Sequence, residues 1–162
     1  MYLDKAKERA KNLYPLTGWK PTSCTHEEVE ELERWCGHHF PEAYREFLLW
    51  MGRSGGGFLA GSDCFYRHLK DLPAAALELL AEDQFTGQLP ANIFIFFMHQ
   101  GYQLNFFYFD DGDDPPVYWY IEEIPTRVAF TQLYAHFSDF ILTEIEGHIK
   151  GAINYSMRDE VD

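Results

Sequence analysis

Histidine and cysteine side chains gather in the first quarter of the chain, where their types could bind a metal ion. Cys36, His38 and His39 lie close together, and Cys24 and His26 precede them by about three helical turns. A zinc site needs four converging ligands, which usually come as two close pairs at short spacing. No Cys-x-x-Cys pair is present, and Cys36 falls on the apolar stripe of an expected helix. The sequence therefore predicts no metal site and no cofactor.

Nucleophilic catalysis would need a thiol or hydroxyl activated by a base. Cys64 and His68 lie one helical turn apart, but no third group that would orient the imidazole is evident. Ser54, in the run Gly-Arg-Ser-Gly-Gly, is typical of a flexible turn, because no strand precedes it. His26 lacks the second histidine four residues later that a zincin helix requires. We predict no catalytic residues, and a small hydrolase that uses Cys64 and His68 is the remaining enzymatic alternative.

Carboxylates concentrate in the segment 110–114, which carries Asp110, Asp111, Asp113 and Asp114. Their order does not match a calcium-binding loop, which needs alternating acidic positions and a glutamate at the twelfth. One interpretation is a solvated hairpin turn, because Asp and Gly tolerate the backbone angles of turns. The other joins this segment with Glu122 and Glu123 into an acidic ridge at one end of a sheet. Such a ridge would meet the basic cleft of a nuclease favourably.

Aromatic residues accompany these carboxylates. Tyr102, Tyr118, Trp119 and Tyr120 lie in or beside the same expected strands, so Tyr118 and Tyr120 face away from Trp119. Exposed tyrosines next to carboxylates are typical anchors of a protein interface. The equal alternative is that the terminal helix covers this face and that the rings belong to the core.

The elements that position these residues begin with three strands. The runs 93–98, 104–109 and 117–121 are apolar and rich in aromatic and β-branched residues, which predicts consecutive antiparallel strands. The segment 99–102 and the acidic segment 110–114 have the composition of the connecting turns.

Helices are expected before and after these strands in the sequence, packed at one face of the sheet and at its N-terminal end. Thr25 followed by Glu28 is a capping-box signature, and Gly37 sits where a helix ends. Pro41 opens a second helix, and residues 2–13 and 74–81 are also expected to be helical. A long amphipathic helix is predicted from Thr131 onward, covering one face of the sheet, followed by a polar tail at 152–162. Its expected apolar stripe is Leu133, Tyr134, Phe137, Ile141 and Ile145.

Length and composition fit one α+β domain over residues 1–162, with a central antiparallel sheet. The chain is 46% hydrophobic and 17% aromatic, which supplies a core, and its net charge is -13. That charge opposes binding to nucleic acid and to anionic membranes, and it attracts basic proteins. The simpler interpretation is that the acidity confers solubility.

Cysteine usage and the terminal residues indicate a compartment. The three cysteines form an odd set with no close pair, so a reducing environment is expected. Residues 1–11 are polar and no segment approaches 18 uninterrupted apolar residues. We expect a cytoplasmic protein.

The first two expected helices also resemble a known family. The run EEVEEL at 27–32, the run FPEAYREFL at 40–48 and the glycines at 55–57 are similar to the opening of SUKH domains. That family typically shows E-x-x-L-G-x-x-L-P-x-x-Y-x-x-F-L-x-x-N-G-G. The chain departs from it in Trp35-Cys36 before Gly37, in Phe40 where leucine is usual, and in having no asparagine before the glycines. The resemblance spans about residues 19–147.

The resemblance implies binding without catalysis. SUKH proteins are antidotes to polymorphic bacterial toxins, many of which act on nucleic acids, and fungal relatives act in cell-wall regulation. It therefore implies a cytoplasmic immunity-type protein that neutralises a basic toxin domain. The alternative is a regulatory or scaffold module that binds endogenous proteins.

Overall fold

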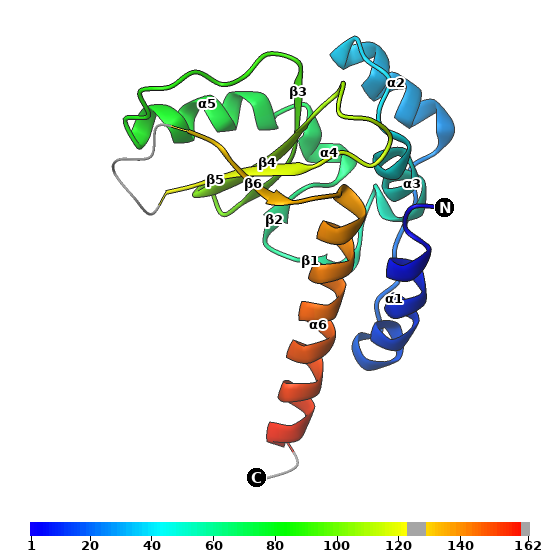
Figure 1. Cartoon of the computed structure of the whole chain (residues 1–162). Helices are drawn as coiled ribbons and strands as arrows, with labels where there is room; N and C mark the ends of the chain where they lie inside the picture. Colours follow the sequence, from blue (N-terminus) through cyan, green and yellow to red (C-terminus); the bar gives the residue numbers. More distant parts are fainter. Residues whose placement is uncertain (123–128, 160–162) are drawn as a thin grey trace.

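A computed structural model gives the fold of residues 1–122 and 129–159, with side chains described as far as residue 154 (Figure 1). The elements follow in the order α1 (Asp4–Thr17), α2 (His26–Cys36), α3 (Glu42–Met51), β1 (Gly56–Leu59), β2 (Ser62–Asp63), α4 (Tyr66–Leu69), α5 (Leu72–Glu82), β3 (Ile93–His99), β4 (Gln103–Tyr108), β5 (Val117–Ile121), β6 (Thr131–Tyr134) and α6 (Phe137–Asp159). In this described part, no helix is both long enough and apolar enough to cross a membrane.

A five-stranded antiparallel sheet forms the centre, in the order β2-β3-β4-β5-β6. The three strands predicted from the apolar runs are confirmed as β3, β4 and β5. Phe94 lies opposite Phe107, and Leu104 lies opposite Tyr120. Because side chains alternate along a strand, Phe107 faces one side of the sheet, whereas Leu104 and Tyr120 face the other.

The helical pair α2–α3 packs on the face that carries Phe107. The predicted capping box is present, since the Thr25 hydroxyl accepts from the Glu28 N–H and the Glu28 carboxylate accepts from the Thr25 N–H. Gly37 ends α2 with a positive φ of 75°. The apolar residues of α3, Tyr44, Phe47, Leu48 and Met51, are buried. The Tyr44 ring contacts those of Phe94, Phe96, Phe107 and Phe137.

The opposite face packs against other residues. Phe85, which follows α5, contacts Tyr120 at 5.3 Å between ring centres, and Phe130 contacts Phe106 at 5.2 Å. Helix α5 itself lies against β3. Both faces of the sheet are therefore covered, and the core extends through both layers.

The prediction of a helix from Thr131 is wrong at its start. Residues 131–134 form β6, in which Thr131 pairs with Trp119 and Tyr134 with Val117. Pairing with the neighbouring strand overrides the helical spacing, because Thr and Tyr favour strands when a partner edge is available. The helix begins at Phe137 and continues to Asp159, so it includes residues 152–159 of the predicted polar tail.

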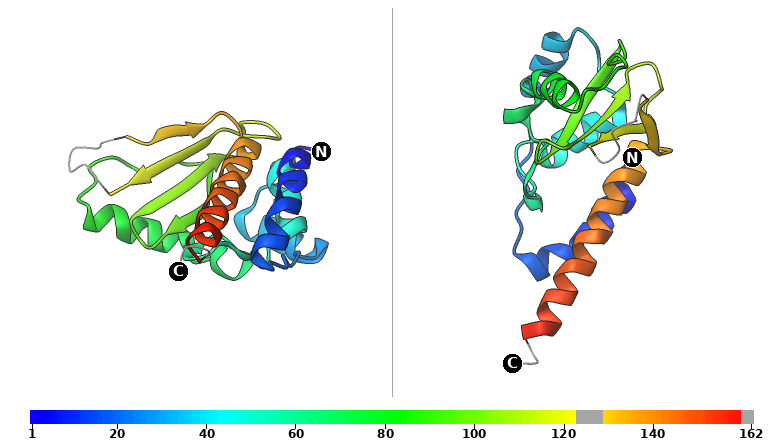
Figure 2. Two further views of the ribbon diagram at one scale, coloured as in Figure 1. Left: turned by 90° about the horizontal axis from the view of Figure 1, so that it is seen from below. Right: turned by 90° about the vertical axis from the view of Figure 1, so that its left-hand side faces the viewer.

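The terminal helix also covers less of the sheet than predicted. Phe137 and Phe140, in its first turn, contact Phe96 of β3. The rest of α6 runs beside α1 and away from the sheet (Figure 2). Helix α1 is held to α3 by Glu46, whose buried carboxylate accepts from the Leu3 N–H at 3.1 Å and from the Lys7 ammonium at 2.7 Å.

Two short strands, β1 and β2, were not predicted. Strand β1 begins within the glycine run, where the backbone passes directly over an indole. A Cβ placed on Gly57, whose φ is 134°, would lie 2.3 Å from the Trp19 Nε1. Glycine is therefore required there by close approach as well as by backbone angle.

Two buried tyrosines predict opposite responses to loss of their hydroxyl. The Tyr44 hydroxyl is buried and has no hydrogen-bond partner among the described residues, whereas the Tyr120 hydroxyl donates to the Asp83 carboxylate. We expect Tyr44→Phe to leave the free energy of unfolding unchanged or to raise it by about 1 kcal/mol, and Tyr120→Phe to lower it by about 2 kcal/mol. Urea denaturation of both variants measures this. A loss of stability in Tyr44→Phe would contradict the assignment.

Candidate functional site

The acidic segment 110–114 forms the connection between β4 and β5, as predicted, and we call it the acidic turn. Asp110, Asp111 and Asp113 are exposed, and Asp114 is partly buried. The Asp110 carboxylate accepts from the Asn92 side-chain amide. The turn thus presents three carboxylates to solvent.

Two hydrogen-bonded contacts hold the acidic turn in place. The Asp114 carboxylate accepts from the Ser138 N–H at 2.9 Å and from the Ser138 hydroxyl at 2.6 Å, at the start of α6. The Asp113 carbonyl accepts from the Ala43 N–H at 2.8 Å, at the start of α3. Both bonds satisfy N–H groups that the first turn of a helix leaves without a partner. Asp114 therefore has a structural role, and the turn is held against two helices.

The structure does not place Glu122, a member of the predicted acidic ridge, beside the acidic turn, and Tyr102 lies with Glu122. Strand β5 runs from the acidic turn to the opposite end of the sheet, which is about 17 Å away at the usual rise per residue. There the Glu122 N–H donates to the Tyr102 carbonyl at 2.9 Å. Antiparallel pairing therefore separates these two residues from the acidic turn. Glu123, the remaining member of the predicted ridge, lies outside the described residues.

The predicted tyrosine anchors are largely core residues. Tyr120 is 1% exposed, and Tyr118 is half-buried with its ring stacked on Phe106. Their face is covered by Phe85 and Phe130 rather than by the terminal helix. Neither ring stands free on the surface, whereas Tyr102 is partly exposed beside His99 at the far end of the sheet.

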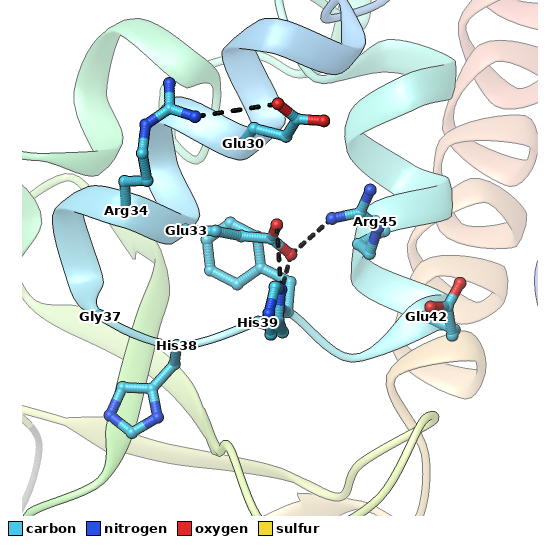
Figure 3. A pocket seen from close by; sticks show the side chains of 9 residues that line it. Glu30, Glu33, Arg34, Gly37, His38, His39, Glu42 and Arg45 are labelled. Atoms are coloured by element: carbon cyan, nitrogen blue, oxygen red, sulfur yellow. Dashed lines mark hydrogen bonds and ion pairs between the residues drawn. The ribbon is translucent and has the colours of Figure 1, made fainter.

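A groove of about 710 Å³ adjoins the acidic turn, and we call it the α2–α3 groove (Figure 3). It lies where α2 passes into α3, and its polar lining residues are Glu30, Glu33, Arg34, His38, His39, Glu42 and Arg45. The His38 ring stacks on Phe109 at 4.2 Å, and the start of α3 is bonded to Asp113. Phe109 precedes the acidic turn and Ala43 follows the lining residue Glu42, so the groove lies next to the turn.

The floor of the groove is organised by one buried carboxylate. Glu33 is 7% exposed, and its Oε1 accepts from the Phe40 N–H at 2.8 Å and from the Arg45 guanidinium at 2.5 Å. The exposed His39 ring lies 3.5 Å from the other oxygen (Figure 3). Burial alone would raise the pKa of Glu33, but these hydrogen bonds and the charge of Arg45 outweigh it and lower the pKa. Glu33 is therefore an ionised structural group.

Other charged side chains lie at the rim of the groove. Glu42 is exposed and points away from Arg45, and Glu30 lies 3.8 Å from Arg34 across one turn of α2. Tyr2, 45% exposed, lines a neighbouring hollow together with Glu42 and Arg45, and its pKa is raised by desolvation and then by the charges of Asp113, Asp114 and Glu42. The sequence motifs did not point to Glu42 or Tyr2 as site residues. No local pattern links residue 2 to residue 113, so only the packed fold could have revealed them.

The enzymatic and metal-binding candidates are not assembled. Cys64 is 2% exposed, and burial followed by the nearby Asp63 charge raises the pKa of its thiol, which therefore stays protonated. His68 Nε2 accepts from the Arg67 Nε at 2.9 Å, and its buried Nδ1 has no hydrogen-bond partner among the described residues, so neither ring nitrogen is bonded to that sulfur. Within residues 1–122 and 129–159, no three His, Cys, Asp or Glu side chains converge in a way that could hold a metal ion.

The chain matches the sequence model of a known protein family. The model of the SMI1 / KNR4 family (SUKH-1) matches residues 23–143, close to the span expected from the sequence motifs. No curated protein matches the chain. The glutamate, glycine, proline and tyrosine of the family run correspond to Glu33, Gly37, Pro41 and Tyr44 here. In this structure these positions close α2, open α3 and fill the core, so the shared run specifies the scaffold of the groove.

The role of Glu33 predicts a pH-dependent stability. Glu33→Ala should lower the free energy of unfolding by about 3 kcal/mol, because it leaves Arg45 and the Phe40 N–H without their acceptor. Glu30→Ala on the same helix removes an exposed pair and should change it by less than about 0.5 kcal/mol.

The pH dependence of the free energy of unfolding is a second test of the role of Glu33. Since the folded-state pKa of Glu33 lies below the unfolded value of about 4.3, its contribution is complete above that pH. It is lost as the pH falls through the folded-state pKa. Urea denaturation between pH 3 and pH 7 should show a smaller loss of stability in Glu33→Ala than in the wild-type protein. An unchanged loss would refute the assignment.

Proposed function

The chain belongs to the SMI1 / KNR4 (SUKH-1) family, which is associated with toxin immunity, and from this premise we propose that it neutralises a cognate toxin domain by binding it. The toxin would be a basic domain, such as a nuclease, and the chain would act in the cytoplasm without chemistry of its own. The observation that carries the proposal is the acidic turn, whose three exposed carboxylates stand beside an open groove.

Charge supports a basic protein as the partner. Acidic residues outnumber basic ones by 26 to 13, so the molecule repels nucleic acid and anionic lipid and attracts positive surfaces. A nuclease cleft is positive because it holds phosphates, and an acidic surface that enters such a cleft would exclude the substrate. The three cysteines are all free thiols, in keeping with a reducing compartment.

Rigidity of the acidic turn supports the same role. Its anchoring hydrogen bonds, one from Ala43 and two from Ser138, hold the backbone of the turn in place before a partner arrives. A preorganised surface loses little conformational entropy on binding, so more of its interaction energy appears as affinity.

Charge neutralisation at the turn tests the proposed surface. The double variant Asp111→Asn/Asp113→Asn should slow association with the toxin domain by about 3- to 10-fold at low salt and flatten its salt dependence, because steering depends on these charges. Glu78→Gln/Glu82→Gln is the matched control, since it removes two exposed charges from α5. Stopped-flow or surface-binding kinetics give both values. Equal effects of the two double variants would reject the acidic turn as the contact surface.

Immunity itself is tested by rescue of growth. The toxin domain encoded beside the gene for this chain should stop growth of a bacterial host, and co-expression of the wild-type chain should restore it. A complex of the two proteins should then co-purify. If the chain leaves toxicity unchanged and stable complexes form instead with proteins of the uninjured host, the regulatory or scaffold alternative replaces immunity.

A further inference from the structure

A second groove lies between the end of α1 and the outer part of α6, and we call it the α6 groove. Its volume is about 420 Å³, and its lining includes Trp19, Glu144, Gly147, His148 and Gly151. Helices α1 and α6 run side by side here, away from the sheet (Figures 1 and 2). The family run, which lies in α2 and α3, does not contribute to it.

Glu144 is a carboxylate without a counter-charge in this groove. Its side chain is partly buried, and no ion pair or hydrogen bond to it occurs among the side chains that the structure describes, in residues 1–122 and 129–154. Burial therefore raises the pKa of Glu144, whereas Glu46 and Glu33, the buried carboxylates of α3 and α2, each have a basic partner. Glu146, two residues further along α6, lies 3.6 Å from Arg9.

His148, one turn after Glu144, does not supply the missing positive charge. The Leu59 N–H donates to His148 Nε2 at 3.4 Å, which requires that nitrogen to be unprotonated. The ring is packed edge-on against Trp19 and Phe58, each at 5.2 Å, and burial lowers its pKa. The imidazole is thus neutral and forms an aromatic wall with Trp19.

Two glycines keep the groove open beside this carboxylate. Gly147 and Gly151 lie in the interior of α6, where glycine is less favourable than alanine by roughly 1 kcal/mol. A Cβ at either position would meet no atom within 4 Å, so no packing contact within the chain requires glycine there. With Glu144 they lie at spacings of three and four residues and so share one side of the helix.

We propose that the α6 groove receives a lysine or arginine side chain from a protein partner. The cationic head would pair with the Glu144 carboxylate, and the methylene chain would lie along Gly147 and Gly151 beside the Trp19 indole. A groove that is lined by both an unpaired carboxylate and an aromatic wall matches the two parts of such a side chain, since long basic residues bury their stems while their heads make charged contacts. This site is separate from the acidic turn, and it does not depend on the partner being a toxin.

A titration with blocked amino acids tests the site directly. N-acetyl-lysine-methylamide and N-acetyl-arginine-methylamide should each shift the Trp19 indole NMR signal, which Trp19→Phe identifies. The uncharged N-acetyl-norleucine-methylamide has a similar apolar chain and should shift it at least about fivefold less, because a charged pair is worth more than stem contact alone. Equal shifts with all three ligands, or no shift with any, would overturn the proposal.

Substitution of Glu144 separates this role from a structural one. Glu144→Gln should abolish the shift caused by the charged ligands and also raise Tm, because at pH 7 the folded state no longer holds an unpaired carboxylate. Glu146→Gln is the matched control on the same helix, and it should retain the shift without any rise in Tm. If Glu144→Gln lowered Tm, Glu144 would have a stabilising partner within the chain and the proposal would fail.

Filling the groove gives an independent readout. Gly147→Ala should raise Tm by about 2–4 °C, as expected for a helix-interior glycine in a chain of this size, while it weakens the lysine-dependent shift. Retention of the full shift in Gly147→Ala would show that the floor of the groove takes no part.

Discussion

The buried carboxylate of Glu33 is the constraint that positions the α2–α3 groove and, through α3, the acidic turn. It joins the end of α2 to the start of α3 through the Phe40 N–H and the Arg45 guanidinium. This fixes the direction of α3 and so places the Tyr44 ring among the aromatic side chains of the sheet. The first turn of α3 then offers the Ala43 N–H to the acidic turn. An exposed surface is thus positioned through a chain of buried contacts that begins at one ion pair.

The strongly acidic composition serves two physical purposes in this fold. Glu33, Glu46 and Asp114 each accept two hydrogen bonds from described residues, and they join elements that are distant in sequence. Such carboxylates cannot be lost without leaving donors unsatisfied, so they are structural. Asp111 and Asp113 instead present their side chains to solvent, where they contribute to the field around the molecule. Net charge alone does not distinguish structural carboxylates from exposed ones. The hydrogen-bond donors around each carboxylate oxygen distinguish them.

Local sequence patterns predicted most helices and strands. Errors arose where pairing between strands that are distant in sequence determines the structure. The capping box at Thr25 and the three apolar strands depend on neighbours in sequence, so spacing was sufficient. The segment 131–134 has helical spacing but lies beside the open edge of β5, and the strand pairing could be recognised only once the sheet was assembled. The same cause separated Glu122 from the acidic turn, since strand direction determines which end of a sheet a residue occupies. Tyr2 reaches the site through the docking of α1, for which the sequence carries no local signal.

The acidic turn and the α6 groove would contribute to binding in different ways. Exposed charges act over about one Debye length, roughly 8 Å at physiological salt, so the carboxylates of the turn mainly raise the rate of encounter. A partly buried carboxylate such as Glu144 is screened less by water and salt. A cation paired with it is therefore attracted more strongly and dissociates more slowly. Its main effect would be on the rate of dissociation, which accounts for most differences in affinity among related complexes. A protein that acts by occupying its partner needs both rapid capture and slow release. The scaffold permits this because α6 begins at the acidic turn, through Ser138, and continues to the groove.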